Sequence, residues 1–179
     1  MNLFRLSHLA MSGPVVRGVL FLSLAFCLSA AAQESVSARV QWYGIYTAGE
    51  TKEIDDPTSP TGKRFTTTPR PPASNSDRIP AQHLRFGLVY VLSGGADNKT
   101  VSVKHVYRFP PGGMPDRVAG GTRSTYEHIM EGVKMGSTTL IGWSFEGAAV
   151  DQMPLGDWTF EVWYDGRKLV EQHFTVIQL

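Results

Sequence analysis

The chain has 179 residues, with 17 Lys and Arg against 16 Asp and Glu and a single cysteine. This near balance, without any basic run, argues against a nucleic-acid binder, and one cysteine excludes a disulfide framework within the chain. A chain of this length usually forms one domain, which buries enough apolar surface to fold without covalent or metal crosslinks.

Residues 1–32 are typical of a secretory signal peptide. Two arginines are their only formal charges, and an apolar run over residues 19–28 leads to small residues that end at Ala32. A basic head, a short apolar stretch and small residues at the exit predict export and cleavage after Ala32. The apolar run is too short for a dedicated membrane span. Met1 and Met11 both remain candidate start residues.

Residues 33–179, which remain after this cleavage, comprise 147 residues with 15 Lys and Arg, 16 Asp and Glu, and no cysteine. They therefore lack a thiol nucleophile and a cysteine metal site. Cys27 follows the bulky Phe26, a departure from the small residue expected before a lipidated cysteine. We expect a single domain that is periplasmic or secreted, with no stable membrane span after signal cleavage.

Seven segments of this domain alternate apolar and polar side chains, which predicts β-strands, and Gly, Pro, Asn and Asp separate them. No segment has a long helical period, although residues 126–134 would also fit a short helix. These features favour an all-β fold, an antiparallel β-sandwich of about seven strands. The predicted strands are residues 37–46, 84–92, 100–109, 124–134 and 137–145, with the two arms of a hairpin over 155–177.

Residues 47–82 differ in composition from the predicted strands. They contain six prolines and many Thr, Ser and Asp residues. Proline supplies no backbone donor and fixes its own φ angle, so a central strand is excluded here. We predict a long Pro- and Thr-rich loop after the first strand, with a hairpin between residues 51–54 and 63–66 as the alternative.

The hairpin over residues 155–177 turns at Asp165-Gly166, a dipeptide typical of hairpin loops. Both arms place their even-numbered apolar residues on one face, because side chains alternate along a strand. Even positions face each other only if the loop has an odd length, so we predict a three-residue loop with a left-handed Gly166. The predicted core residues are Trp158, Phe160, Val162, Tyr164, Val170, Phe174 and Val176.

Two stretches of the chain resemble a known family. Residues 153–169, followed by Phe174-Thr175-Val176, look like the final hairpin of exported immunoglobulin-like modules, and Trp42-Tyr43-Gly44-Ile45-Tyr46 lies near the start of the domain. Together they resemble the bacterial domain-of-unknown-function family 3859. This resemblance implies an exported sandwich of the immunoglobulin-like type. It implies no activity, because the family offers no assigned chemistry and a fold alone supplies none.

The histidines, serines and carboxylates do not form a known catalytic or metal-binding motif. The histidines lack ligand spacings such as H-x-H or H-E-x-x-H, and no G-x-S-x-G elbow occurs. The sequence therefore predicts no cofactor, no metal site and no catalytic residue, although carboxylates could still pair across loops. The residues concerned are His83, His105, His128 and His173, with Asp55, Asp56, Asp151 and Asp157.

Trp163 is predicted to face away from the core. It follows Trp158 by five positions, an odd number, so the two lie on opposite faces of the strand if no bulge intervenes. On that face Trp163 would meet Leu169, beside Glu161 and His173. Such an apolar spot on a polar face is either a binding patch or the resting place of the Pro-rich segment. Trp163, Leu169, His173 and Glu161 are therefore the candidate binding residues.

Two functions from different classes fit these observations. The favoured function is an envelope or periplasmic interaction module that binds a protein or a polysaccharide. The alternative is a small hydrolase that uses a carboxylate or a histidine at the edge of the sandwich. The sequence shows no catalytic constellation, so we expect a binding protein rather than an enzyme. A pocket that contained two of the histidines would favour the hydrolase.

Overall fold

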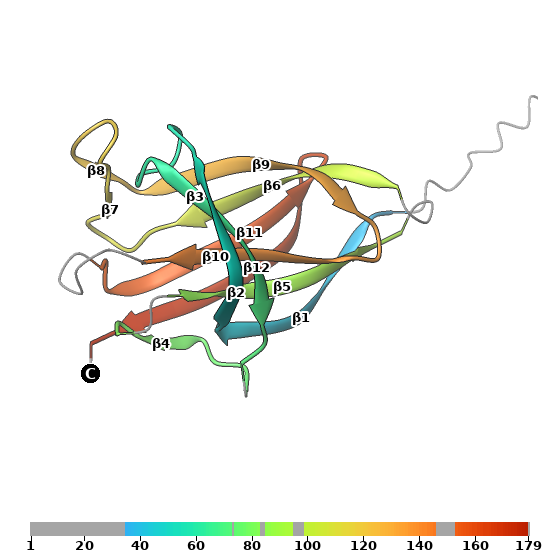
Figure 1. Ribbon diagram of the computed structural model, residues 1–179, viewed down its shortest axis with the longest axis horizontal. Helices are drawn as coiled ribbons and strands as arrows, with labels where there is room; N and C mark the ends of the chain where they lie inside the picture. The colour runs from blue at the N-terminus through green and yellow to red at the C-terminus, as the bar shows by residue number, and fades with distance from the viewer. Residues whose placement is uncertain (1–34, 73, 83–84, 95–98, 146–152, 179) are drawn as a thin grey trace, which may run out of the picture. The chain divides into compact units, whose positions relative to one another are not determined.

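The computed structural model describes residues 35–72, 74–82, 85–94, 99–145 and 153–178, all within one compact unit that spans Gln33–Leu179. These residues form twelve strands, and among them there is no helix that could cross a membrane (Figure 1). The all-β class is confirmed, whereas the predicted number of about seven strands is too small. The strands are β1 (Ser37–Ile45), β2 (Thr47–Asp55), β3 (Lys63–Arg70), β4 (Arg78–Pro80), β5 (Arg85–Ser93), β6 (Thr100–Arg108), β7 (Met114–Pro115), β8 (Thr122–Arg123), β9 (Thr125–Lys134), β10 (Thr138–Ser144), β11 (Gly156–Tyr164) and β12 (Arg167–Ile177).

Two sheets form a sandwich. One has the strand order β1-β5-β10, and the other has the order β4-β12-β11-β6-β9. Neighbouring strands are antiparallel except β12 and β4, which run parallel. Aromatic side chains fill the space between the sheets: the rings of Phe86 on β5 and Trp158 on β11 are both fully buried and lie 5.4 Å apart. Because the domain has no cysteine, burial of such rings rather than a disulfide holds the sheets together.

The closing hairpin of β11 and β12 confirms the predicted buried face. Trp158 pairs with Phe174, and Val162 pairs with Val170. All four side chains are buried, three of them completely. β9 likewise shows that residues 125–134 form a strand and not the alternative short helix.

The loop of this hairpin differs from the prediction. Asp165 and Gly166 have φ angles of 48° and 71°, as in a two-residue type I′ turn. The predicted three-residue loop is therefore wrong. One extra residue is still needed to bring the even-numbered residues of the two strands opposite each other, and it lies within β12. The register shifts there, so that Trp163 pairs with Lys168 and Leu169 is the extra residue.

Residues 47–82 are not simply a long loop, because they contain three strands. The alternative hairpin is present in a longer form as β2 and β3. The prolines explain why strands form here. They occupy a turn, strand ends and an edge strand, where a missing N–H group costs little. Pro57 and Pro60 lie in the turn between β2 and β3, Pro69 is near the end of β3, and Pro80 ends the edge strand β4.

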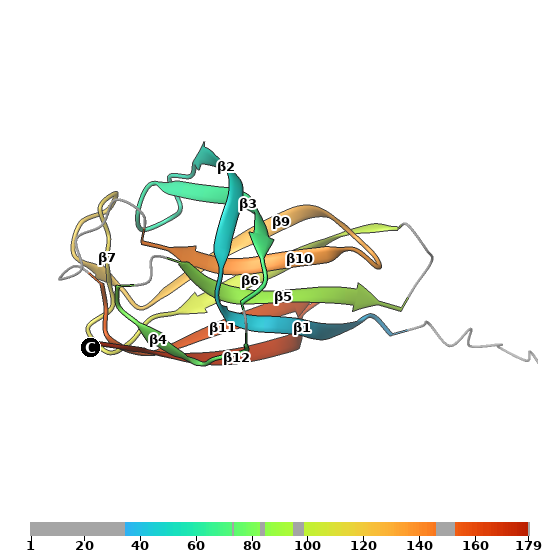
Figure 2. The ribbon, with the colours of Figure 1, turned by 60° about the horizontal axis from the view of Figure 1, so that its bottom comes forward.

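The β2–β3 hairpin lies across the outer face of the three-stranded sheet, over β10 and β5 (Figure 2). Hydrogen bonds fix its turn to the rest of the domain, among them one from the Arg123 guanidinium to the Thr58 carbonyl. The Arg117 N–H donates to the Pro60 carbonyl at 2.8 Å, and the Tyr126 hydroxyl donates to Asp56 at 2.7 Å. Val89, on the outer face of β5, is accordingly only 3% exposed. The three-stranded sheet is thus covered on both faces near its central strand, as its apolar sequence predicts.

Candidate functional site

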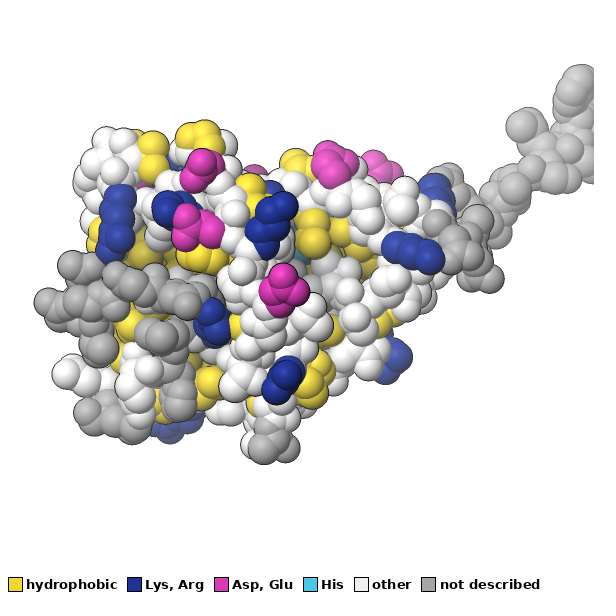
Figure 3. Space-filling model, viewed as in Figure 1, with side chains coloured by type: hydrophobic (Ala, Val, Ile, Leu, Met, Phe, Trp, Pro, Cys, Tyr) yellow, Lys and Arg dark blue, Asp and Glu magenta, His cyan; other side chains and the backbone are white. Residues whose placement is uncertain are grey.

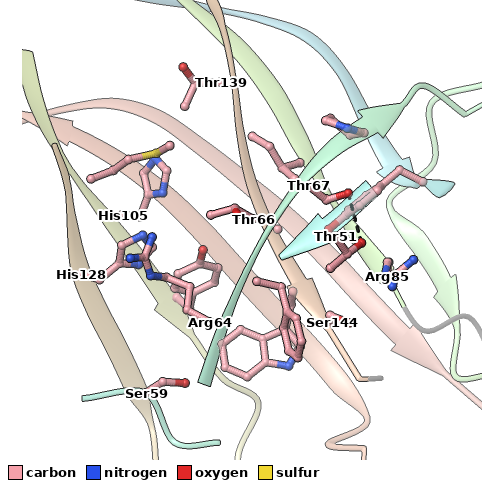
Figure 4. Close-up of a pocket in the computed structure, with 18 of the residues that line it drawn as sticks. Thr51, Ser59, Arg64, Thr66, Thr67, Arg85, His105, His128, Thr139 and Ser144 are labelled. Carbon is pink, nitrogen blue, oxygen red and sulfur yellow. Dashed lines mark hydrogen bonds between the residues drawn. The ribbon is translucent and has the colours of Figure 1, made fainter. Parts of the chain in front are cut away.

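A cavity of about 370 Å³ lies beneath the β2–β3 hairpin (Figure 4). Residues 63–69 of β3 form one wall, and most of residues 138–144 of β10 form the opposite wall. β6 and β9, from the other sheet, complete the cavity with histidine and tyrosine side chains. The cavity is therefore built where the hairpin covers the side of the sandwich between the edge strands β10 and β9, and its volume is that of a small-molecule site.

Arg64 extends from β3 across the cavity towards His128 (Figure 4). Its side chain is 33% exposed, and its Nε lies 3.6 Å from Asp56 Oδ2, too far for a hydrogen bond. Asp56 instead accepts hydrogen bonds from the Thr58 backbone N–H at 3.0 Å and from the Tyr126 hydroxyl at 2.7 Å. Among the described residues, the guanidinium of Arg64 is in no hydrogen bond, and its five N–H donors remain available.

His105 on β6 and His128 on β9 are directly paired across their strands, with ring centroids 5.1 Å apart. His105 is 1% exposed, and its Nε2 lies 2.9 Å from the Tyr90 hydroxyl. Burial, and then the charge of Arg64, lowers the pKa of His128 to about 4. Burial, followed by the charges of His128 and Arg64, holds the pKa of His105 well below its ordinary value. Both rings are therefore neutral near pH 7.

Hydroxyl groups and aromatic rings make up most of the remaining lining. Thr66 and Thr67 project from β3, and the Thr67 hydroxyl accepts a hydrogen bond from Thr51 at 3.3 Å (Figure 4). The ring of Trp143, on β10, is 6% exposed and lies 5.4 Å from the ring of Tyr107. Flat rings beside hydroxyl groups suit a ligand that has both apolar faces and polar edges.

Three buried nitrogen atoms of the cavity-lining side chains have no hydrogen-bond partner within the described residues: Arg64 Nε, His128 Nδ1 and Trp143 Nε1. Buried polar atoms are nearly always paired, and an unpaired one costs roughly 1–3 kcal/mol. Two of the three, on Arg64 and Trp143, can only donate. A cluster of unpaired donors around one cavity therefore indicates a place for a ligand that brings acceptors.

The charged side chains that line the cavity are all basic. They are Lys63, Arg64 and Arg85, and no carboxylate is among the described lining residues. On the outer surface of this face, by contrast, basic and acidic side chains are interspersed around the hairpin (Figure 3). The positive character is thus a property of the cavity and not of the whole face.

Two of the predicted binding residues, Trp163 and Glu161, lie together in a network of charges on the outer face of the five-stranded sheet. Glu161 is only 3% exposed and accepts hydrogen bonds from Arg108 Nε at 2.9 Å and from Trp163 Nε1 at 2.7 Å. Burial alone would raise the pKa of Glu161, but these hydrogen bonds and the charges of Arg108 and Lys168 lower it overall. Lys104 and Lys168 lie 5.4 and 5.7 Å from the centre of the Trp163 ring. The polar groups of this patch already bind one another.

The other two predicted binding residues, Leu169 and His173, have surroundings of their own. Leu169 packs against the core, because the bulge puts Lys168 opposite Trp163. His173 is exposed and hydrogen-bonds with Thr159 and Glu171, at 3.1 and 3.0 Å. The β2–β3 hairpin covers the three-stranded sheet, so this part of the Pro-rich segment does not rest on the patch.

Of the other residues considered from the sequence, His83 and Asp151 lie outside the described residues. His105 and His128 meet in the cavity, and Asp56 lies beside it. Asp157 is elsewhere, where it accepts a hydrogen bond from Thr175 at 2.8 Å. Within the part of the chain that the structure describes, no three His, Cys, Asp or Glu side chains are grouped as metal ligands would be.

Arg64 and Trp143 were not recognised from the sequence. Trp143 lies on a predicted strand, but alternation along a strand cannot show that its N–H group lacks a partner. Arg64 lies in the stretch predicted as a loop, and it meets His128, 64 positions later, only through the tertiary fold. The one sequence signal was the unusual concentration of threonines around residues 61–68, several of which line the cavity.

The two facing antiparallel sheets and the closing hairpin define the class of immunoglobulin-like β-sandwiches. A solved structure that is similar to the chain agrees with this class: an immunoglobulin-like protein from Pseudomonas aeruginosa is 21% identical, with a TM-score of 0.55. The similarity covers 82% of this chain and 99% of that one. At this identity the likeness shows the fold alone, and it confirms the predicted immunoglobulin-like sandwich.

The family follows from the sequence itself. The profile of the family described as "Domain of unknown function (DUF3859)" matches residues 34–176. The chain therefore belongs to this family, and the resemblance that its closing hairpin and its Trp42–Tyr46 stretch suggested is confirmed. No match was found among curated proteins.

Proposed function

We propose that the protein is an exported binding module of the cell envelope, and that its cavity holds one or two sugar residues of an envelope polysaccharide. The observation that carries this proposal is the cluster of unpaired nitrogen atoms of Arg64, His128 and Trp143 around a cavity of about 370 Å³. A sugar supplies hydroxyl and ring oxygens that accept such hydrogen bonds, and its apolar face packs on aromatic rings.

A protein partner fits the cavity less well than a glycan. Protein interfaces of ordinary size are broad surfaces of about 800 Å² per partner, whereas this site is a hollow of about 370 Å³ beneath a hairpin. The Trp163 patch also presents an aromatic ring, but its Nε1 already donates to Glu161 and two lysines lie over the ring. The patch remains a sequence prediction, and the cavity is the better-supported site.

The hydrolase is the second candidate, because the cavity does contain two histidines. The structure gives it less support than the binding function. The Tyr90 hydroxyl, which is hydrogen-bonded to His105, is fully buried, and burial raises its pKa above the ordinary value. That hydroxyl is therefore a poor nucleophile. The lowered pKa of His128 makes the ring a weak base near pH 7, and no carboxylate of the described lining is available to orient it.

The test is to measure binding of oligosaccharides released from the bacterial envelope, by saturation-transfer NMR, to the domain of residues 33–179. Thr66→Trp places a large ring in the cavity from β3, and we expect it to weaken binding by about tenfold or more. Thr100→Trp adds the same side chain at an exposed position outside the lining and serves as the control. Equal binding by both variants would reject the cavity as the site. Turnover of the oligosaccharides, abolished by His128→Gln, would support the hydrolase instead.

A further inference from the structure

We infer that the ligand is an acidic sugar, whose carboxylate forms hydrogen bonds with the guanidinium of Arg64 inside the cavity. This inference rests on the proposed function and adds the chemical class of the ligand. Arginine presents a planar fork of N–H donors that matches the two oxygens of a carboxylate. Arg64 lines the cavity, and its buried Nε has no hydrogen-bond partner within the described residues.

Asp56 does not supply the missing acceptor for Arg64. Its nearest oxygen is 3.6 Å from Arg64 Nε, beyond hydrogen-bonding distance. The carboxylate is engaged by other donors: the Thr58 N–H at 3.0 Å, the Thr58 hydroxyl at 2.5 Å and the Tyr126 hydroxyl at 2.7 Å. Asp56 is not among the residues that line the cavity, and at 3.6 Å it offsets part of the charge of Arg64 without accepting a hydrogen bond from it.

The rest of the cavity favours a negative group over a neutral one. Lys63 and Arg85 are the other charged side chains of the lining, and no carboxylate of the described lining opposes an anion. Lys63 is partly neutralised, because it forms an ion pair with Glu53. The N–H group of Trp143 is a further unpaired donor. An anion leaves water only where several donors replace its hydration, and this cavity provides them.

The balance of charge indicates a carboxylate in preference to a phosphate. Of the three cations in the lining, Lys63 is paired with Glu53, and Asp56 offsets part of the charge of Arg64, so much of the positive charge is already balanced. His105 and His128 are close by but lack positive charge near pH 7. The remaining positive charge of the lining matches the single negative charge of a carboxylate. A phosphate near pH 7 carries about 1.5 to 2 negative charges and is matched less well.

The experiment compares methyl β-D-glucuronide with methyl β-D-glucoside, which differ only in having a carboxylate or a hydroxymethyl group at the same carbon. Titration of the domain, followed by NMR, should show tighter binding of the glucuronide by about tenfold or more. Arg64→Gln should bring the ratio of the two affinities close to one. Arg64→Lys, which keeps the charge and loses the fork, should keep only part of the preference. Arg70→Gln, at an exposed position on the same strand outside the lining, should leave the ratio unchanged.

The possible results separate this inference from the proposed function. Equal binding of both sugars at the cavity would overturn the acidic ligand and leave the binding module standing. Tighter binding of glucose 6-phosphate than of the glucuronide would also overturn it, in favour of a phosphate. Acetate that binds as tightly as the glucuronide would show an anion site without sugar recognition. Absence of binding both by these sugars and by envelope oligosaccharides would overturn the proposed function itself. Thermal melts of each variant establish that it is folded.

Discussion

Truncation of Trp158 should be among the most destabilising changes in the domain. The side chain is fully buried, and its ring lies within 5.0–6.4 Å of five other aromatic rings. Removing a large core side chain costs about 3–5 kcal/mol. The indole N–H also donates to the Pro154 carbonyl at 3.0 Å, and the lost hydrogen bond adds about 1 kcal/mol. We expect Trp158→Ala to lower the free energy of unfolding by about 4–6 kcal/mol.

Trp163, five positions later, should behave differently. Its side chain is partly exposed on the outer face, and its main specific interaction is the hydrogen bond of 2.7 Å to the buried Glu161. Loss of that bond and of partial ring burial should cost about 1–2 kcal/mol in Trp163→Ala. Trp163→Phe keeps a ring beside Lys104 and Lys168 but removes the N–H, so it should cost about 1 kcal/mol.

The assay is urea unfolding of the three variants and the unchanged domain, followed by far-ultraviolet circular dichroism. The slope of free energy against urea should be the same for all, so that the midpoints report stability alone. A loss for Trp163→Ala as large as that for Trp158→Ala would refute the assignment of the two tryptophans to opposite faces. A loss below about 1 kcal/mol for Trp158→Ala would refute the described aromatic core.

Three further predictions concern pH, backbone packing and export. Burial and Arg64 hold the pKa of His128 at about 4, below the unfolded value near 6.5, so acid protonates the unfolded chain first. The free energy of unfolding should therefore fall between about pH 6.5 and 4, by at most about 1.4 kcal/mol per pH unit for this residue, and His128→Gln should make the fall shallower in pH-dependent melts. An unchanged slope would contradict this. A Cβ at Gly87 would lie 2.4 Å from the Ile141 carbonyl oxygen, whereas one at Gly142 would first meet the Tyr46 hydroxyl at 2.9 Å. Thermal melts should thus show that Gly87→Ala is the more destabilising, and the reverse order would contradict the described pairing of β5 and β10. For export, intact-mass measurement of protein from periplasm should show a chain that begins at Gln33, and an uncleaved or acylated chain would reject the predicted signal.

Alternation along strands predicted the core of the closing hairpin but not its loop. The even-numbered face of Trp158 and Phe174 depends only on the period of two that every strand shares. The length of the loop depends on whether the one extra residue of the hairpin lies in the turn or within a strand. Asp165 tolerates a positive φ, so the tight type I′ turn forms and the extra residue moves to Leu169. That one-residue difference puts Lys168, and not Leu169, opposite Trp163 in the ladder.

Composition was a poor guide for residues 47–82, because it counts prolines without placing them. Pro57 and Pro60 fall in the turn, where proline is favoured, and Pro80 falls on an edge strand. The candidate site could not be predicted for a different reason. Arg64 and His128 belong to different sheets, so no local spacing relates them, and only the covering of the sandwich by the hairpin brings them together.

The most direct test of the cavity as the binding site is to follow the four indole N–H signals in a ¹H–¹⁵N NMR spectrum during titration with methyl β-D-glucuronide. Trp143 has an unpaired N–H group in the cavity lining, whereas the N–H groups of Trp158 and Trp163 already have partners. Trp143→Phe identifies the Trp143 signal by its loss. We expect that signal to move most, as its proton gains a hydrogen bond. If the signal of Trp163 moves instead and that of Trp143 stays still, the ligand binds the outer patch and the cavity is not the site.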